Sequence, residues 1–374
     1  KNLADKNVAM ENRTQEFDNL AHKYADLQQG LGEYSATDEL ASQAKKELQA
    51  GNLDKAESLL EQAYERDQKL ADKRLSQHSM LLAELSELKL DRSKSIERYQ
   101  TVVKQQPDNL QAWQNLAELA EKVGDTTLAL NAWQQLGKNA DVTKNTTAHF
   151  NALMGEGNIL SLQGHNTEAL TRYQSAQTFT QQRAIKEPAN PDIQDDLAVT
   201  FDRMGDVYQA NGDSNAALES YQASLEVRKK LAALDPNNVS WQRSLSVSFD
   251  NMGYIYQVKG DNVAALDAFQ GALTVRKKLT QLDPNNNDWQ RTLSVSFKNI
   301  GEIYQAQGDN NAALQAFQDS LTIKQKLSQL APNNIQWQNS LAVGFEKVGD
   351  IRQAIGENPA ALKAHQEGLE IRQR

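Results

Sequence analysis

The chain has 374 residues, of which 39% are hydrophobic, and only 7 prolines and 19 glycines interrupt it. It has no cysteine, which excludes disulfides, thiolate zinc sites and cysteine nucleophiles. The formal net charge of −9 argues against binding to nucleic acid, because phosphate-backbone binding relies on clustered Lys and Arg. Good helix formers dominate and runs of alternating β-branched residues are missing, so we expect an all-α protein.

No stretch approaches the roughly 20 uninterrupted apolar residues of a membrane-spanning helix, and the opening residues have no signal-peptide core. We therefore expect no membrane span and a cytoplasmic location, while a periplasmic or membrane-tethered parent protein stays open. The sequence begins with Lys1 rather than Met, so we expect an excerpt or a processed form of a longer protein.

Residues 1–37 begin with apolar side chains at a spacing of three and four, extended backward in steps of seven: Leu3, Met10, Phe17, Leu20, Tyr24, Leu27 and Leu31. This pattern predicts an amphipathic helix with a narrow apolar seam. Two interpretations stay open, namely that the helix packs on the first repeat or that it pairs with another copy as a short coiled coil. The segment "QQGLGEYSAT" is predicted to be the loop that follows.

Residues 38–144 contain three irregular units in which two small residues stand twelve apart and a bulky residue follows four later. The three sets are Ala44, Ala56 and Leu60; Ala83, Ser95 and Tyr99; and Ala117, Ala129 and Trp133. Each set predicts one pair of short helices.

Residues 145–374 repeat at a period of 48, shown by Trp241, Trp289 and Trp337. Five glycines in the same register are each followed twelve residues later by alanine. The glycines are Gly157, Gly205, Gly253, Gly301 and Gly349, and the alanines are Ala169, Ala217, Ala265, Ala313 and Ala361. We expect five elongated units here, the last of them incomplete.

The pattern within "MGYIYQVKGDNVAALDAFQGAL" resembles the tetratricopeptide repeat (TPR); it consists of Gly253, Tyr256, Gly260, Ala265, Phe269 and Ala272. The resemblance implies a right-handed superhelix, or α-solenoid, of antiparallel helix pairs, in eight units after the N-terminal amphipathic helix. The elongated units look like those of bacterial multidomain TPR proteins, and in architecture they are similar to kinesin light chain repeats.

The ordinary TPR period is about 34 residues, so the last units carry 14 more. The positions of the closing prolines predict that seven lengthen the second helix of a unit and seven lengthen the first helix of the next; these prolines are Pro188, Pro236, Pro284 and Pro332. The repeated tryptophan is predicted to be buried at the corner between the elongated helices.

The sequence gives no sign of catalytic chemistry. The five histidines are scattered among different units without metal-ligand spacing, and no phosphate loop or "GxSxG" occurs. We expect no enzyme, no metal and no cofactor, with an enzyme that has an unrecognised site as a remote alternative.

Repeats of this family work through a concave surface lined by the first helix of each pair. Carrying over the family's inward positions gives a candidate peptide-binding groove: Asp202, Asp206, Gln209, Asp250, Tyr254, Gln257, Lys298, Glu302, Gln305, Glu346, Asp350 and Gln353. Its six carboxylates face one lysine, which predicts a preference for a basic partner, and its glutamine column can bond a peptide backbone. The other interpretation is a solvated face produced by tandem duplication. The cations Arg228, Arg276, Lys324 and Arg372 recur in the second helices and are predicted to lie on a solvated outer face.

We therefore expect a protein–protein interaction scaffold that binds a peptide or protein in this groove, as the recognition arm of a larger protein. The alternative is a structural module that self-associates through residues 1–37 or through the C-terminal repeat. In that last repeat the apolar residues Ala361, Leu362, Leu369 and Ile371 are expected to be only partly covered, with mobility rising from Asn358.

Overall fold

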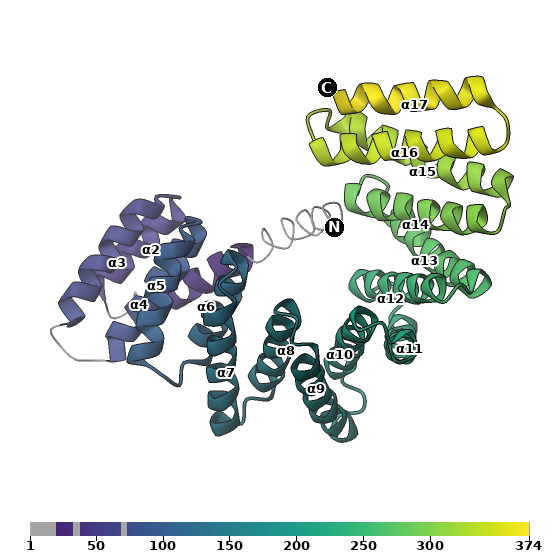
Figure 1. Ribbon diagram of the computed structural model, residues 1–374. Helices are drawn as coiled ribbons and strands as arrows, with labels where there is room; N and C mark the ends of the chain where they lie inside the picture. Colours follow the sequence, from purple (N-terminus) through teal and green to yellow (C-terminus); the bar gives the residue numbers. More distant parts are fainter. Residues whose placement is uncertain (1–19, 33–37, 69–72, 374) are drawn as a thin grey trace. The chain divides into compact units, whose positions relative to one another are not determined.

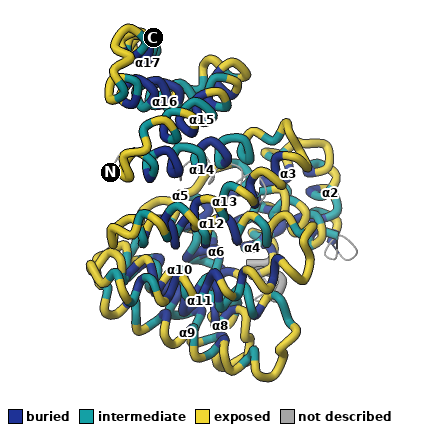
Figure 2. The backbone as a smooth tube through the Cα atoms, turned by 90° about the vertical axis from the view of Figure 1, so that its right-hand side faces the viewer, coloured by how far each residue is buried: buried dark blue, intermediate teal, exposed yellow. Residues whose placement is uncertain are grey.

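The computed structural model describes residues 20–32, 38–68 and 73–373, and every regular element within these ranges is a helix (Figure 1). The chain divides into two compact units, Lys1–Ala176 and Gln177–Arg374. Buried and exposed residues alternate along each helix in Figure 2, as expected of amphipathic helices that each bury one face. None of the helices in the described ranges combines the length and the apolar content that crossing a membrane requires.

The first unit opens with a helix over residues 20–32 and continues with helix pairs joined by short turns. The pairs are α2 (Glu39–Gln49) with α3 (Leu53–Gln68), α4 (Lys73–Leu88) with α5 (Arg92–Gln105), α6 (Leu110–Val123) with α7 (Thr126–Thr143), and α8 (Thr146–Leu162) with the first part of α9 (Asn166–Lys186). The helix at 20–32 runs through Gly30 and Gly32, so the first five residues of the loop predicted from "QQGLGEYSAT" are helical, and residues 33–37 lie outside the described residues.

The second unit repeats one arrangement four times after the end of α9. Its pairs are α10 (Pro191–Ala210) with α11 (Ser214–Leu234), α12 (Val239–Val258) with α13 (Asn262–Leu282), α14 (Asn287–Ala306) with α15 (Asn310–Leu330), and α16 (Ile335–Ala354) with α17 (Asn358–Gln373). The second helix of each pair also packs against the first helix of the next pair, so the core runs along the stack.

The turns follow from a short local code. Within a pair, Gly260 adopts a φ of 77° directly after the end of α12, a left-handed conformation that glycine adopts at the least cost. Asp261 then caps α13 by accepting a hydrogen bond from the Ala264 amide at 3.0 Å. Between pairs, Pro284 cannot continue α13, and Asn286 caps α14 through the Trp289 amide at 3.1 Å.

The helices of the second unit are longer than those of the early repeats, as the prolines predict. α11, α13 and α15 have 21 residues against 14 in α5. α12, α14 and α16 have 20 residues against 14 in α6. Each elongation is therefore nearly two turns, about 10 Å of helix.

The repeated glycines lie where the two helices of a pair touch. A Cβ atom added to Gly253 would stand 2.5 Å from the Phe269 ring, and one on Gly301 would stand 2.6 Å from Phe317. The glycine is therefore required by close approach of an aromatic ring. The tryptophans behave differently from the prediction, because Trp241, Trp289 and Trp337 are only half-buried. Trp289 nevertheless packs on the core of its unit.

Candidate peptide-binding surface

The candidate groove residues stand at equivalent positions of four consecutive first helices: α10, α12, α14 and α16. The glutamine column is exposed in all four of them, at Gln209, Gln257, Gln305 and Gln353. Tyr254 is 38% exposed, and its hydroxyl accepts a hydrogen bond from the Asn299 amide nitrogen at 2.8 Å, which joins α12 to α14. Lys347 of α16 reaches Glu302 of α14 at 3.0 Å. These two contacts connect neighbouring first helices along the candidate surface.

Asp202 and Asp250 are not solvent-facing members of this surface, contrary to the prediction. Asp202 lies 2.7 Å from Arg228, and Asp250, which is 8% exposed, is hydrogen-bonded to Arg276. Burial raises the pKa of both carboxyl groups, while the paired arginine opposes the rise. Both aspartates are therefore structural partners of an arginine and are closed to a ligand.

Three of the four recurring cations, Arg228, Arg276 and Lys324, are buried, contrary to the predicted solvated face, whereas Arg372 is exposed as predicted. Arg228 and Arg276 are 6% and 5% exposed, and each joins three helices. Arg276 of α13 bonds Asp250 of its own pair and the Ser296 hydroxyl of α14 at 2.7 Å. Arg228 of α11 does the same with Asp202 and, at 2.8 Å, with Ser248 of α12. The sequence contained a sign of this pairing, because an aspartate is followed 26 residues later by an arginine in both repeats.

The remaining carboxylates of the candidate surface also have cationic neighbours. Glu346 bonds Arg372 at 2.7 Å, and Glu302 bonds Lys298 at 3.1 Å as well as Lys347. Burial tends to raise the pKa of Glu302, but the two lysines outweigh it and hold the pKa below its usual range. Four of the six carboxylates are therefore paired with a cation, and the ratio of six acids to one lysine overstates the negative charge of this surface.

Only Asp206 and Asp350 remain as well-exposed carboxylates of the candidate set. Asp206 accepts a hydrogen bond from the Tyr221 hydroxyl at 2.8 Å and lies 3.4 Å from Arg203. Asp350 lies 3.7 Å from a ring nitrogen of His365. A basic preference would thus rest on two carboxylates that are far apart in the sequence.

The N-terminal helix packs on the first repeats over its described part, residues 20–32. Leu27 and Leu31 are fully buried, and the Tyr24 hydroxyl donates to the Leu48 carbonyl at 3.1 Å. The cluster that surrounds the two leucines contains Ala41, Ala44, Leu48, Ala56, Leu60, Leu81, Leu82 and Leu85. Because Leu27 and Leu31 are buried within the chain, they cannot also contact a second copy. The other predicted seam residues Leu3, Met10 and Phe17 lie outside the described residues.

This helix lies on the inward positions of α2 and α4. The register that places Gln257 four residues after Gly253 places Leu48 four after Ala44 and Glu87 four after Ala83. The Leu48 side chain lies in the same buried cluster as Leu27 and Leu31, its backbone carbonyl accepts from the Tyr24 hydroxyl, and Glu87 accepts a hydrogen bond from Lys23. A segment of this chain therefore occupies, in the first unit, the face that is predicted to bind peptides in the second.

A hollow of about 700 Å³ adjoins the same helix and extends the occupied face toward α6; it is lined by His22, Lys23, Asp26, Glu84, Gln111, Gln114, Asn115 and Glu118. Burial raises the pKa of Glu84 to about 7; Lys23 opposes the rise, and the charges of Glu87 and Asp26 add to it. The sequence analysis assigned no site here, because it applied the inward register only to the elongated repeats.

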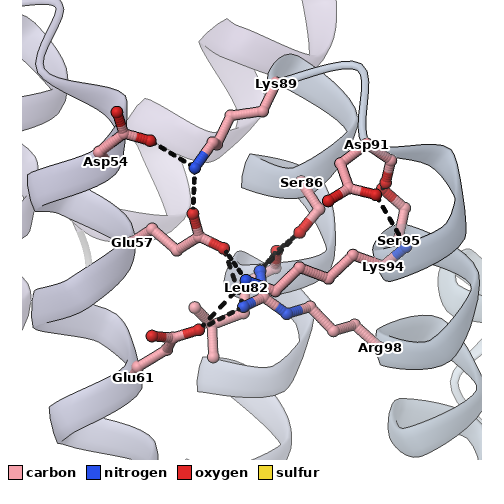
Figure 3. Close-up of polar contacts among 10 residues, drawn as sticks. All are labelled: Asp54, Glu57, Glu61, Leu82, Ser86, Lys89, Asp91, Lys94, Ser95 and Arg98. Carbon is pink, nitrogen blue, oxygen red and sulfur yellow. Dashed lines mark hydrogen bonds and ion pairs between the residues drawn. The ribbon is translucent and has the colours of Figure 1, made fainter.

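A second charged cluster in the first unit is fully satisfied within the chain (Figure 3). Glu57 of α3 is hydrogen-bonded to Lys89, lies 2.6 Å from Lys94 and 2.9 Å from Arg98, and Arg98 also bonds Glu61 at 2.7 Å. Burial would raise the pKa of Glu57, but the three cations outweigh it and lower the pKa to about 2. The cluster ties α3 to α5 and leaves no unpaired group for a ligand.

Comparison with known proteins agrees with this architecture. Three family profiles described as tetratricopeptide repeat match residues 90–141, 200–231 and 295–330. A search of curated proteins gave no match. The chain thus contains tetratricopeptide repeats in these three segments, and it has the fold of an all-α solenoid. Repeats of this family generally mediate protein–protein interaction.

Several solved structures are similar in fold at low sequence identity. The signal transduction ATPase (STAND) PH0952 from Pyrococcus horikoshii, which has a tetratricopeptide repeat sensor, is 12% identical with a TM-score of 0.58; the match covers 95% of this chain and 53% of that one. The apo quorum sensor NprR from B. thuringiensis is 12% identical with a TM-score of 0.53, covering 97% and 99%. BtubC (BKLC) from P. vanneervenii is 16% identical with a TM-score of 0.51, covering 67% and 90%.

Proposed function

We propose that this chain is a protein-interaction module that binds an extended peptide segment along the first helices of its second unit. The binding surface consists of Gln257, Gln305 and Gln353 together with the exposed face of Tyr254. The observation that carries the proposal is the occupation of the equivalent face in the first unit by the chain's own helix at residues 20–32.

The chemistry of the exposed residues suits a peptide backbone. A glutamine amide both donates and accepts, so a column of them at equal steps matches the donors and acceptors of an extended chain. The Tyr254 ring is held edge-on against Phe269, with centroids 5.2 Å apart, and its hydroxyl is fixed by Asn299. A rigid half-exposed aromatic ring gives apolar contact area at a small cost in conformational entropy.

A peptide library displayed on phage and selected on the whole chain tests the proposal, with the selected peptides measured on two matched variants. The first variant carries Gln257→Ala and Gln305→Ala on the candidate surface. The control carries Gln222→Ala and Gln270→Ala, which are exposed glutamines 48 residues apart on the second helices α11 and α13. Loss of two backbone hydrogen bonds corresponds to a loss in affinity of roughly tenfold or more.

The expected result is weaker binding by the first variant and unchanged binding by the control. Equal affinities for both variants and the wild-type chain would contradict the proposal, as would selection of no peptide at all. The same proposal includes the prediction that this chain is the part of a larger protein that recognises its partner.

A further inference from the structure

The two columns of charge described above are interrupted at one repeat. The first column consists of the residues three before the repeated glycine, on the first helix of each pair. The second column consists of the residues 26 after these, on the second helix of the same pair. They pair as Asp202 with Arg228, Asp250 with Arg276, Lys298 with Lys324, and Glu346 with Arg372. Three of these are acid–base pairs that form ion pairs in the structure. In the repeat of α14 and α15 both positions are lysine.

Lys324 has lost both of the partners that the equivalent arginines have. It is as deeply buried as they are, with 6% exposure. The position of Ser248 and Ser296, whose hydroxyls accept from the arginines, is taken here by Gly344, and a Cβ on Gly344 would lie 3.2 Å from the Cδ atom of Lys324. No described residue forms a hydrogen bond or an ion pair with Lys324.

The groups that face Lys324 from α14 and α16 do not neutralise it. They are Lys298, Glu302 and Lys347, so one carboxylate is shared among three ammonium groups. Glu302 is already bonded to Lys298 at 3.1 Å and to Lys347 at 3.0 Å. Burial lowers the pKa of Lys324 to about 8, the two neighbouring lysines add to the fall, and Glu302 opposes it. Near neutral pH most of Lys324 is therefore still protonated.

We propose that Lys298, Lys324 and Lys347 form a carboxylate-binding subsite for an acidic side chain of the bound peptide. A buried ammonium without an acceptor carries an uncompensated desolvation cost, which an incoming anion removes. Lys298 and Lys347 are 29% and 33% exposed on their side chains, so the cluster can be reached from solvent. The inference rests on the proposed peptide-binding surface, because Lys298 belongs to the same helix face as Gln305.

The subsite reverses, at this one repeat, the basic preference that the sequence suggested for the whole groove. It also predicts a position along the peptide, since the acidic side chain must lie beside the backbone segment that contacts Gln305. The test uses end-blocked peptides selected on the chain, each resynthesised with Asp, Asn or Lys at every position in turn. Versions with a free C-terminus separate a terminal carboxylate from a side-chain carboxylate.

Two variants remove the subsite in different ways. Lys298→Asp introduces the residue that Asp202 and Asp250 provide in the preceding repeats, so we expect Lys324 to gain an internal partner in a chain of unchanged helicity. Lys324→Met removes the buried charge and keeps the volume. The control is Lys326→Asp, which makes the same change of charge as Lys298→Asp at an exposed site on α15.

At one peptide position we expect the wild-type chain to bind the Asp version at least about tenfold more tightly than the Asn version, the range of a charge-assisted hydrogen bond. This discrimination should disappear in Lys298→Asp and in Lys324→Met and persist in Lys326→Asp. Equal binding of the Asp and Asn versions, or an equal loss in the control, overturns the subsite while leaving the peptide-binding surface intact.

A second measurement is independent of any peptide. The pKa of Lys324 is followed by NMR of lysine labelled with ¹³C at Cε, in sodium acetate and in sodium chloride of equal ionic strength. A higher pKa in acetate, absent from Lys298→Asp, supports the subsite even where no peptide binds. An unchanged pKa overturns it.

Discussion

Replacement of Gly253 by alanine tests whether close approach of the Phe269 ring is the reason for the repeated glycine. An added Cβ would lie 2.5, 2.6 and 2.7 Å from three carbons of that ring, whereas ordinary contact begins at 3.4 Å. The ring is 1% exposed, and Tyr254 lies edge-on against it, so it has little room to move away.

Two opposing terms set the expected magnitude. Alanine favours a helix over glycine by about 1 kcal/mol, while overpacking a closed contact costs about 1–3 kcal/mol. In the wild-type background, Gly253→Ala should therefore lower the free energy of unfolding by about 0–2 kcal/mol. In a Phe269→Leu background the clash is relieved, and the same substitution should become stabilising by about 1 kcal/mol.

The assay is a double-mutant cycle followed by native-state hydrogen exchange in α12 and α13, because repeat arrays do not always unfold in one step. A coupling energy of about 1–3 kcal/mol between Gly253 and Phe269 is expected. Additive effects, with Gly253→Ala stabilising in both backgrounds, would show that the glycine does not serve this contact. Gly301 and Phe317 offer an equivalent second cycle.

Three further predictions concern the ends of the chain and its charged cluster. Glu57→Gln should remove a pH-dependent part of stability: the Glu57 pKa falls from 4.5 to about 2, so about 3 kcal/mol is present above pH 4.5 and is lost as the pH falls toward 2. Acid titration of unfolding should accordingly be flatter in the variant, and an identical profile would contradict the assignment. Leu31→Ala should destabilise the first unit by about 2–5 kcal/mol without changing the mass in solution, because Leu31 is buried within the chain; loss of a dimer by the variant would restore the seam interpretation. Amides of α17 should exchange faster than those of α15, because Leu362 and Leu369 are 60% and 55% exposed; equal protection in a monomer would refute this.

The helix pairs could be predicted from the sequence because their contacts are periodic. Gly253 and Ala265 recur every 48 residues, and a glycine at a regular offset from an aromatic residue has few explanations other than close packing. The additional length of the helices followed from the prolines, since Pro236 fixes where α11 must end. Both arguments depend on the backbone, which the family pattern constrains strongly.

The burial of the charged columns could not be predicted from that pattern. The ordinary repeat ends its second helix after about 14 residues, as α5 does, and Arg228 belongs to the last seven residues of α11, which α5 lacks. The elongation itself brings the guanidinium over Asp202, so a position that is open in a short repeat becomes covered in a long one. The sequence also left open whether residues 20–32 pack on the first repeat or on a second copy of the chain. An apolar face shows that a helix is covered, but it does not identify the surface that covers it.

The elongation thus creates a buried polar position on α11, α13 and α15, at Arg228, Arg276 and Lys324, and these repeats satisfy it in different ways. Where Arg276 meets Asp250 and Ser296, the chain supplies both the counterion and the hydroxyl. Lys324 receives neither, and its pKa of about 8 against 10.5 corresponds to a penalty of about 3 kcal/mol for folding with this group charged. That penalty is present below pH 8 and fades as the pH rises toward 10.5, because the unfolded chain then also loses the proton. A single change at Lys298 would supply the carboxylate that the neighbouring repeats contain, whereas the chain offers Lys324 only Glu302, which Lys298 and Lys347 already bind.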